Sequence, residues 1–93
     1  MASAWLVEFS REAEADLMKL GAPMRRRIID RLGWLEANFD SVVPLVLGGK
    51  FRGFFKLRVG DWRVIYGIAW ERRRITVHYI DRRDKVYKRK RNA

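Results

Sequence analysis

Cationic side chains recur in the second half of the chain at spacings that suit the binding of a phosphate group. Lys56 and Arg58 are two residues apart in an alternating segment, so they should share one face of a strand. Arg63 follows a tight turn and can lie opposite them, while Arg82 and Arg83 leave the end of the next strand. Alternating basic residues are usually a solvated face. These five cations have no interleaved Asp or Glu on that face, which favours phosphate binding.

The first half of the chain predicts a strand followed by two helices. Residues 4–9 are short, β-branched and aromatic, which is typical of a strand. A helix should begin after Ser10, a common N-cap residue, and Gly21 should end it. A second helix should run from Pro23 to Phe39, where apolar residues recur every three or four positions. With so short a link between them, the two helices should form an antiparallel hairpin.

The second half predicts strands. Residues 40–52 form mainly a loop, in which residues 42–47 could make a short extended piece. Residues 55–59 and 62–70 alternate around the two-residue turn Gly60-Asp61, and residues 75–80 alternate again. We therefore predict an α+β fold in the order β-α-α-β-β-β, with an antiparallel sheet packed on a helical hairpin and a basic C-terminal segment. The tryptophans Trp5, Trp34, Trp62 and Trp70 are expected in the core.

Length and composition exclude several classes of protein. The chain has 93 residues, 48% of them hydrophobic, which predicts one domain over residues 1–93. It has no cysteine and one histidine, which excludes disulfide frameworks, thiolate zinc sites and His-rich metal clusters. We therefore expect no metal and no cofactor. No apolar run is long enough to cross a membrane and no secretory signal is recognised, so we expect a soluble cytoplasmic protein without a membrane partner.

The charge of the chain is strongly asymmetric. Residues 1–49 hold six Lys or Arg and seven Asp or Glu, which gives a net charge of −1. Residues 50–93 hold 15 Lys or Arg and four Asp or Glu, which gives a net charge of +11. Repulsion of that size destabilises a compact state unless an anionic partner is present. The asymmetry therefore indicates nucleic acid or an acidic protein as the partner.

Two segments and the order of the elements resemble a known group of proteins. Residues 53–66 read G-F-F-K-L-R-V-G-D-W-R-V-I-Y, and residues 82–87 read R-R-D-K-V-Y. Both are similar to the RelE/ParE toxin superfamily of type II toxin–antitoxin systems, and the resemblance covers nearly the whole chain. It implies one of two activities. RelE members cleave mRNA in the ribosomal A site, whereas ParE members share the fold but poison DNA gyrase and have no nuclease site.

The resemblance to the RelE branch also implies a set of catalytic residues. Matched position by position, they are Lys56, Arg58, Arg63, either Arg82 or Arg83, and Tyr87. Many relatives have a histidine just before the arginine pair, and Arg82 occupies that position here. His78, the one histidine of the chain, is a reserve candidate for a catalytic base.

The chemistry of RNA cleavage without a metal suits these residue types. The 2′-OH must lose a proton, the charge of the phosphorane must be neutralised and the 5′-oxygen must gain a proton. The arginines can act only as electrostatic clamps, because guanidinium keeps its proton. Neighbouring positive charge disfavours the charged form of Lys56 and so suits it for proton transfer. Tyr87 could relay a proton or stack on a base.

The expected partners are an acidic cognate antitoxin, mRNA and the 16S rRNA of the small ribosomal subunit. Five further cations are expected to bind RNA: Lys50, Arg52, Lys85, Lys88 and Arg89. The first interpretation is therefore a ribosome-dependent mRNA endoribonuclease that blocks translation. A ParE-like gyrase inhibitor is the alternative, and a plain RNA-binding module is a third.

Overall fold

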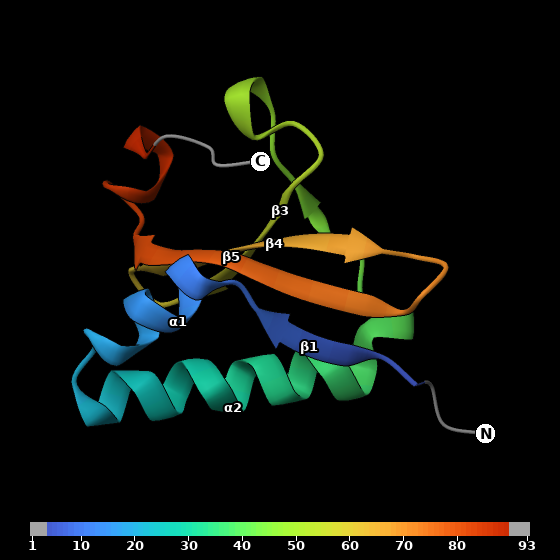
Figure 1. Cartoon of the computed structure of the whole chain (residues 1–93), viewed down its shortest axis with the longest axis horizontal. Coiled ribbons are helices and arrows are strands. Elements are labelled where there is room, and N and C mark those ends of the chain that lie inside the picture. Colours follow the sequence, from blue (N-terminus) through green and yellow to red (C-terminus); the bar gives the residue numbers. More distant parts are fainter. Residues whose placement is uncertain (1–3, 90–93) are drawn as a thin grey trace.

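The computed structural model describes residues 4–89, and it begins with a strand and a helical hairpin (Figure 1). β1 spans Leu6–Phe9, α1 spans Arg11–Met18 and α2 spans Ala22–Asn38. The Ser10 hydroxyl accepts a hydrogen bond from the Ala13 N–H at 3.1 Å and so caps α1, as predicted. Arg25 closes the other end of α1, because its side chain donates to the carbonyls of Leu17 at 3.2 Å and Leu20 at 2.8 Å.

The other strands complete a five-stranded sheet. β2 spans Leu45–Val46, β3 Phe55–Val59, β4 Trp62–Ala69 and β5 Arg74–Arg82, and the sheet order is β1-β5-β4-β3-β2. The predicted α+β fold and its antiparallel meander are confirmed, but the complete sheet is mixed, because β1 pairs with β5 in parallel. The helices and the meander provide the long connection that a parallel pair requires. β2 confirms the short extended piece predicted between residues 42 and 47.

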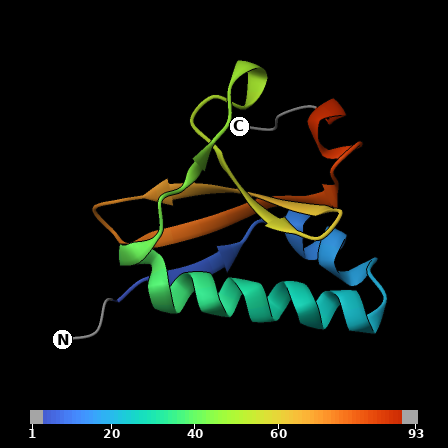
Figure 2. The same ribbon diagram turned by 180° about the vertical axis from the view of Figure 1, so that it is seen from behind.

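The sheet has a buried cluster on each face. The helices cover one face, where Ile28, Leu35 and Val64 are almost fully buried (Figures 1 and 2). On the opposite face, the 3₁₀ turns at Gly49–Phe51 and Val86–Lys88 enclose a smaller cluster formed by Phe51, Phe54, Ile65, Tyr79 and Val86. The loop before β3 and the turn at Val86–Lys88 therefore pack together over the sheet.

The strands β4 and β5 change register at Ile65/Tyr66. Tyr79 lies opposite Ile65 and Val77 lies opposite Tyr66, so His78 falls at the irregularity. Alternation along β5 is therefore interrupted, since Val77 and Ile80 both join the cluster on the helical side. This interruption decides on which face of the sheet the end of β5 projects its side chains.

Two of the four tryptophans are not in the core. Trp5 is buried, and Trp62 packs against the cluster on the helical side. Trp34 is 48% exposed and Trp70 is 58% exposed, so the prediction that they are core residues is wrong. Trp34 lies beside the buried stripe of α2 rather than on it, and Trp70 lies just after β4. Within residues 4–89, no helix combines the length and the apolar character needed to cross a bilayer.

Candidate functional site

Arg58 and Arg63 lie at the end of the β3–β4 hairpin. They are direct partners across the two strands, and the two-residue turn between them begins at Gly60, which has φ +59°. Arg63 Nη1 donates to the Gly60 and Trp62 carbonyls, both at 2.8 Å. The side chain of Arg58 is exposed and makes no hydrogen bond or ion pair within residues 4–89. The predicted juxtaposition of two cations at this turn is therefore present.

Lys56 lies on the same face of the sheet as Arg58, two residues closer to the middle of β3. Its partner in β4 is Ile65, which in turn pairs with Tyr79 in β5. Its side chain is half-buried and makes no ion pair with residues 4–89. Lys56 thus borders the small apolar cluster on the face opposite the helices.

Tyr87 reaches this cluster from the end of the chain. The neighbouring Val86 is fully buried, and the Tyr87 ring packs edge-on against Phe51 with a centroid distance of 6.3 Å. The ring of Phe51 also packs against the ring of Tyr79, with 6.0 Å between the ring centroids. Tyr87 and Lys56 therefore border the same small apolar cluster, although they are 31 positions apart in the sequence.

The arginine pair at the end of β5 is divided between two environments. Arg82 lies opposite Trp62, and its guanidinium carbon is 5.6 Å from the centroid of that ring. Cross-strand partners share a face, so Arg82 lies on the helical side, away from Arg63. The Arg83 N–H donates to the Asp61 carbonyl at 2.8 Å, and its Nε lies 4.0 Å from the Asp61 carboxylate. Both arginines are near the turn, but Arg82 does not share the face of Lys56 and Arg58.

Most of the cations expected to bind RNA are exposed, and Arg89 is the exception. Lys50, Arg52, Lys85 and Lys88 are exposed. Arg89 instead contacts three carboxylates, and its Nη1 lies 2.7 Å from Asp16 Oδ2 and its guanidinium carbon 4.8 Å from the Tyr79 ring centroid. Its role in RNA binding stays a prediction, but its charge is compensated within the fold.

Sequence reasoning missed the carboxylate that anchors Arg89. Asp16 is buried, and its Oδ2 accepts from the Ile80 N–H at 2.9 Å as well as from Arg89. Burial lowers the pKa of Arg89, but the hydrogen bond and charge of Asp16, with Asp81 and Glu12, outweigh it and raise the pKa. The available signal was Asp16 itself, a charged residue one turn after Glu12 on the same side of α1.

His78 lies against the cluster on the face opposite the helices. Its ring stacks on Phe54 with a centroid distance of 4.7 Å and an interplanar angle of 8°. A Cβ atom at Gly67 would come within 3.2 Å of its Nε2, so glycine leaves room for this ring. Within residues 4–89, no group of three His, Asp or Glu side chains is placed to hold a metal ion.

Comparison with known proteins identifies the family. The family model described as the ParE toxin of the type II toxin–antitoxin system parDE matches residues 7–87. The chain belongs to this toxin family. The predicted membership of the RelE/ParE superfamily is therefore confirmed, whereas no curated protein matches the sequence.

Solved structures show that the toxin has the fold of RelE proteins. A RelBE toxin–antitoxin complex of Mycobacterium tuberculosis matches with a TM-score of 0.76 and 24% identity, over 89% of this chain and 98% of that one. The archaeal RelE–RelB complex of Pyrococcus horikoshii matches with a TM-score of 0.69 and 22% identity, over 90% and 100%. A YoeB/ParE toxin of Agrobacterium tumefaciens matches with a TM-score of 0.66 and 17% identity, over 82% and 95%.

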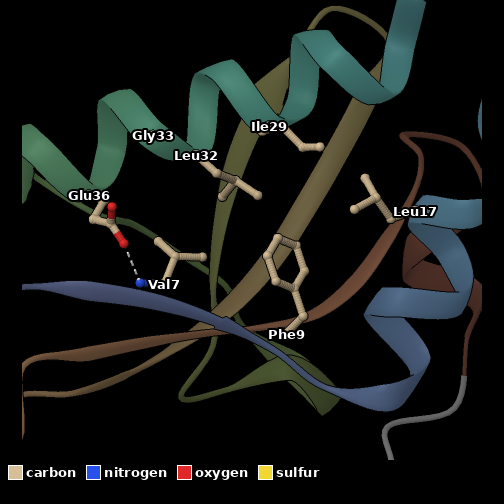
Figure 3. Close-up of a pocket in the computed structure, with 7 residues that line it drawn as sticks. All are labelled: Val7, Phe9, Leu17, Ile29, Leu32, Gly33 and Glu36. Atoms are coloured by element: carbon tan, nitrogen blue, oxygen red, sulfur yellow. Dashed lines mark hydrogen bonds between the residues drawn. The ribbon is translucent and has the colours of Figure 1, made fainter. Parts of the chain in front are cut away.

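The toxin also has an apolar groove on its helical side, away from the cations. Figure 3 shows side chains of α1, α2 and β1 converging on it, among them Leu17, Leu32 and Phe9, around a volume of about 280 Å³. Glu36 at its rim accepts a hydrogen bond from the Val7 N–H at 2.7 Å. The carboxylate thereby covers a backbone donor on the outer edge of β1, where another strand would otherwise pair.

Proposed function

We propose that this toxin is a ribosome-dependent mRNA endoribonuclease that blocks translation by cleaving mRNA in the A site. One observation carries the proposal. Lys56, Arg58 and Arg63 lie on one face of the β3–β4 hairpin, and none of them forms an ion pair with residues 4–89. A binding surface alone can use scattered charges, whereas a reacting phosphate requires charges placed around one point.

The reaction forms a bond between the 2′-oxygen and phosphorus and breaks the bond from phosphorus to the 5′-oxygen. Arg58 and Arg63 neutralise the charge that develops on the phosphorane. Lys56 exchanges a proton at one end of the reaction, at the edge of the apolar cluster where water is less abundant. Tyr87 presents its ring beside that cluster, where it can stack on a base or pass a proton. The ribosome holds the mRNA in position at this exposed site.

An acidic cognate antitoxin is the second partner that we propose. Residues 50–93 carry a net +11, and an acidic segment bound there would relieve their mutual repulsion. The solved structures from M. tuberculosis and P. horikoshii are themselves toxin–antitoxin complexes. The complex should therefore melt at a higher temperature than the free toxin.

A ParE-like inhibitor of DNA gyrase is the alternative function. The family model that matches the chain is that of ParE toxins, which favours this alternative. In this case the exposed cations would bind a partner without performing chemistry, and replacing one of them would weaken binding rather than a reaction step.

Primer extension on an mRNA in a translating extract, together with a gyrase supercoiling assay, tests the proposal. Arg63→Ala should slow mRNA cleavage by roughly a hundred- to a thousandfold and weaken ribosome binding far less. Arg63 is one of many docking cations, whereas the negative charge of the phosphate beside it increases during attack. Lys56→Ala should behave similarly. Arg72→Ala, an exposed arginine in the β4–β5 turn, is the charge-matched control and should cleave normally.

Tyr87→Phe separates the two roles of the phenol, because it keeps the ring and removes the hydroxyl. A large loss of cleavage assigns a proton-transfer role, and near-wild-type cleavage assigns stacking. If the unaltered toxin leaves mRNA intact and blocks gyrase, the nuclease proposal is wrong.

A further inference from the structure

Arg27 of α2 contacts the turn that holds the candidate site. The β3–β4 turn lies over the first half of α2 (Figure 2). A Cβ atom built on Gly60 would lie 3.2 Å from both terminal nitrogens of Arg27 and 3.4 Å from its guanidinium carbon. The guanidinium of Arg27 therefore occupies the space that a side chain at position 60 would take. Arg63 approaches the same residue through the Gly60 carbonyl, at 2.8 Å.

Within residues 4–89, no carboxylate forms an ion pair with the guanidinium groups of Arg27, Arg58 and Arg63 around this turn. The side chains of Arg27 and Arg58 form no hydrogen bond or ion pair within residues 4–89, and Arg63 Nη1 donates to two carbonyl groups. Arg58 and Arg63 are direct cross-strand partners, an arrangement that destabilises a hairpin when both are charged. An anion bound among the three guanidinium groups would relieve this repulsion.

The carboxylates near the turn are engaged elsewhere. Asp61, the second turn residue, lies beside Arg83, with 4.0 Å between its Oδ1 and the Arg83 Nε. Asp81, the strand partner of Arg63, accepts from the Arg82 N–H at 2.8 Å and lies 3.6 Å from Arg89. Neither carboxylate pairs with Arg27, Arg58 or Arg63, so the cluster has room for an anion that the described residues do not supply.

We propose that Arg27, Arg58 and Arg63 form a phosphate-binding site around Gly60 and that its ligand is a phosphodiester of the RNA backbone. A guanidinium presents paired N–H donors that match the oxygens of a phosphate. Arg27 approaches the turn from the helical side, and Arg58 and Arg63 lie on the opposite face, so their donors can bind a tetrahedral phosphate from different directions. The site is continuous with Lys56 along β3, so one RNA strand can occupy both. The inference deepens the proposed function, on which it rests for RNA as the source of the phosphate.

Gly60 has two roles in this site. Its φ of +59° is a backbone conformation that favours glycine. Its missing Cβ also admits the guanidinium of Arg27. An alanine at this position would displace Arg27 without removing a charge, so the contribution of placement can be separated from that of net charge.

Binding of a uridine hexanucleotide to the free toxin, followed by fluorescence anisotropy over a range of salt concentrations, tests the site. Arg27→Gln should weaken binding roughly tenfold, the expected cost of a hydrogen bond to a charged group. It should also reduce the slope of log affinity against log salt by about 0.7, one phosphate contact to a single strand. Arg26→Gln is the matched control, since Arg26 is the exposed neighbour on α2 and its side chain makes no hydrogen bond or ion pair within residues 4–89.

Equal effects of Arg27→Gln and Arg26→Gln would overturn the site, because only overall charge would then matter. Gly60→Ala should reproduce most of the loss seen with Arg27→Gln, provided that thermal unfolding shows a folded protein. Poly-glutamate is titrated in parallel. If Arg27→Gln weakens poly-glutamate binding more than hexanucleotide binding, the site takes protein carboxylates and the proposal is wrong.

The hexanucleotide assay does not require cleavage or a ribosome. A toxin that blocks gyrase but shows the Arg27 effect would therefore contradict the proposed function and leave the phosphate site standing. A toxin that cleaves mRNA but whose RNA binding is unchanged by Arg27→Gln would support the proposed function and contradict the phosphate site.

Discussion

Arg25, Arg58 and Arg89 are the same side chain in three different surroundings. Arg25 donates to carbonyl groups at the end of α1, Arg89 faces the carboxylate of Asp16 at 2.7 Å, and Arg58 has neither kind of partner within residues 4–89. Arg25 and Arg89 therefore stabilise the fold, while the guanidinium of Arg58 stays available to bind a ligand. Net charge alone does not measure binding capacity, because part of it is neutralised internally.

The Asp16–Arg89 pair should contribute strongly to stability. Asp16→Ala removes a buried acceptor that serves both Arg89 and the Ile80 N–H, so it should lower the free energy of unfolding by about 3 kcal/mol. Glu12→Ala, which removes a more exposed contact of 3.6 Å to Arg89, should cost less than about 1 kcal/mol. Urea unfolding measures both variants. Equal losses would mean that Asp16 has no special structural role.

The buried phenol of Tyr66 should make stability depend on alkaline pH. Burial raises the pKa of Tyr66 to about 12, whereas an unfolded chain has the ordinary value of about 10. A raised pKa in the folded state adds stability below pH 10, which is lost as the pH rises towards 12. Near pH 9, the Tyr66→Phe variant should have about the same free energy of unfolding as the wild type. Between pH 9 and about pH 11.5, the variant should lose about 2 kcal/mol less of this free energy than the wild type does. Parallel loss in both proteins would contradict the assignment.

At the scale of elements, the segments around Gly49–Phe51 and Val86–Lys88 depend on one another. Each is a short 3₁₀ turn that has little stability of its own. Phe51 contacts Tyr79 and Tyr87, so the two turns and β5 hold a shared apolar cluster. The position of Tyr87 beside the face that bears Lys56 follows from this packing rather than from the local backbone.

Removing volume from this cluster should loosen both turns. Val86→Ala, at a fully buried position, should lower the free energy of unfolding by about 2 kcal/mol and reduce amide protection around residues 49–54. Val43→Ala, at a position that is 86% exposed, is the matched control and should change stability by less than about 0.5 kcal/mol. Hydrogen exchange checks the prediction, and unchanged protection at residues 49–54 would show that the turns are independent.

At the scale of the whole molecule, the two sides of the sheet differ in character. The helical side carries the apolar groove, whereas the β3–β4 hairpin gathers Arg58, Arg63 and Lys56 on the opposite face. The side that carries the helices is also the side from which Arg27 reaches the turn. The molecule can therefore present cations from two layers to one strand of nucleic acid.

Affinity for ribosomes should fall steeply as salt rises. Each phosphate contact releases counterions, so several contacts by residues 50–93 should lower the affinity by orders of magnitude between about 50 and 200 mM salt. Co-sedimentation with ribosomes at increasing salt measures the slope. A flat response would show that the basic half of the chain is not the docking surface.

The sequence by itself determined the features that depend on local geometry. Ser10 capping α1, the two-residue turn at Gly60-Asp61 and the juxtaposition of Arg58 with Arg63 were all predicted, and the structure contains them. Each depends on residues only a few positions apart, whose relation is fixed by the repeat of a helix or strand and by the turn. The resemblance in residues 53–66 added the family, which the family model confirms.

Tertiary structure decided the features that join distant residues. The parallel placement of β1, the change of register near His78, and the pairing of Arg89 with Asp16 across 73 positions follow from how the elements pack. The change of register moved Arg82 to the helical side, because one irregularity reverses the alternation of every later residue in a strand. The contact of Arg27 with Gly60 also follows from how the elements pack, because the position of Arg27 in α2 does not predict which turn lies next to it.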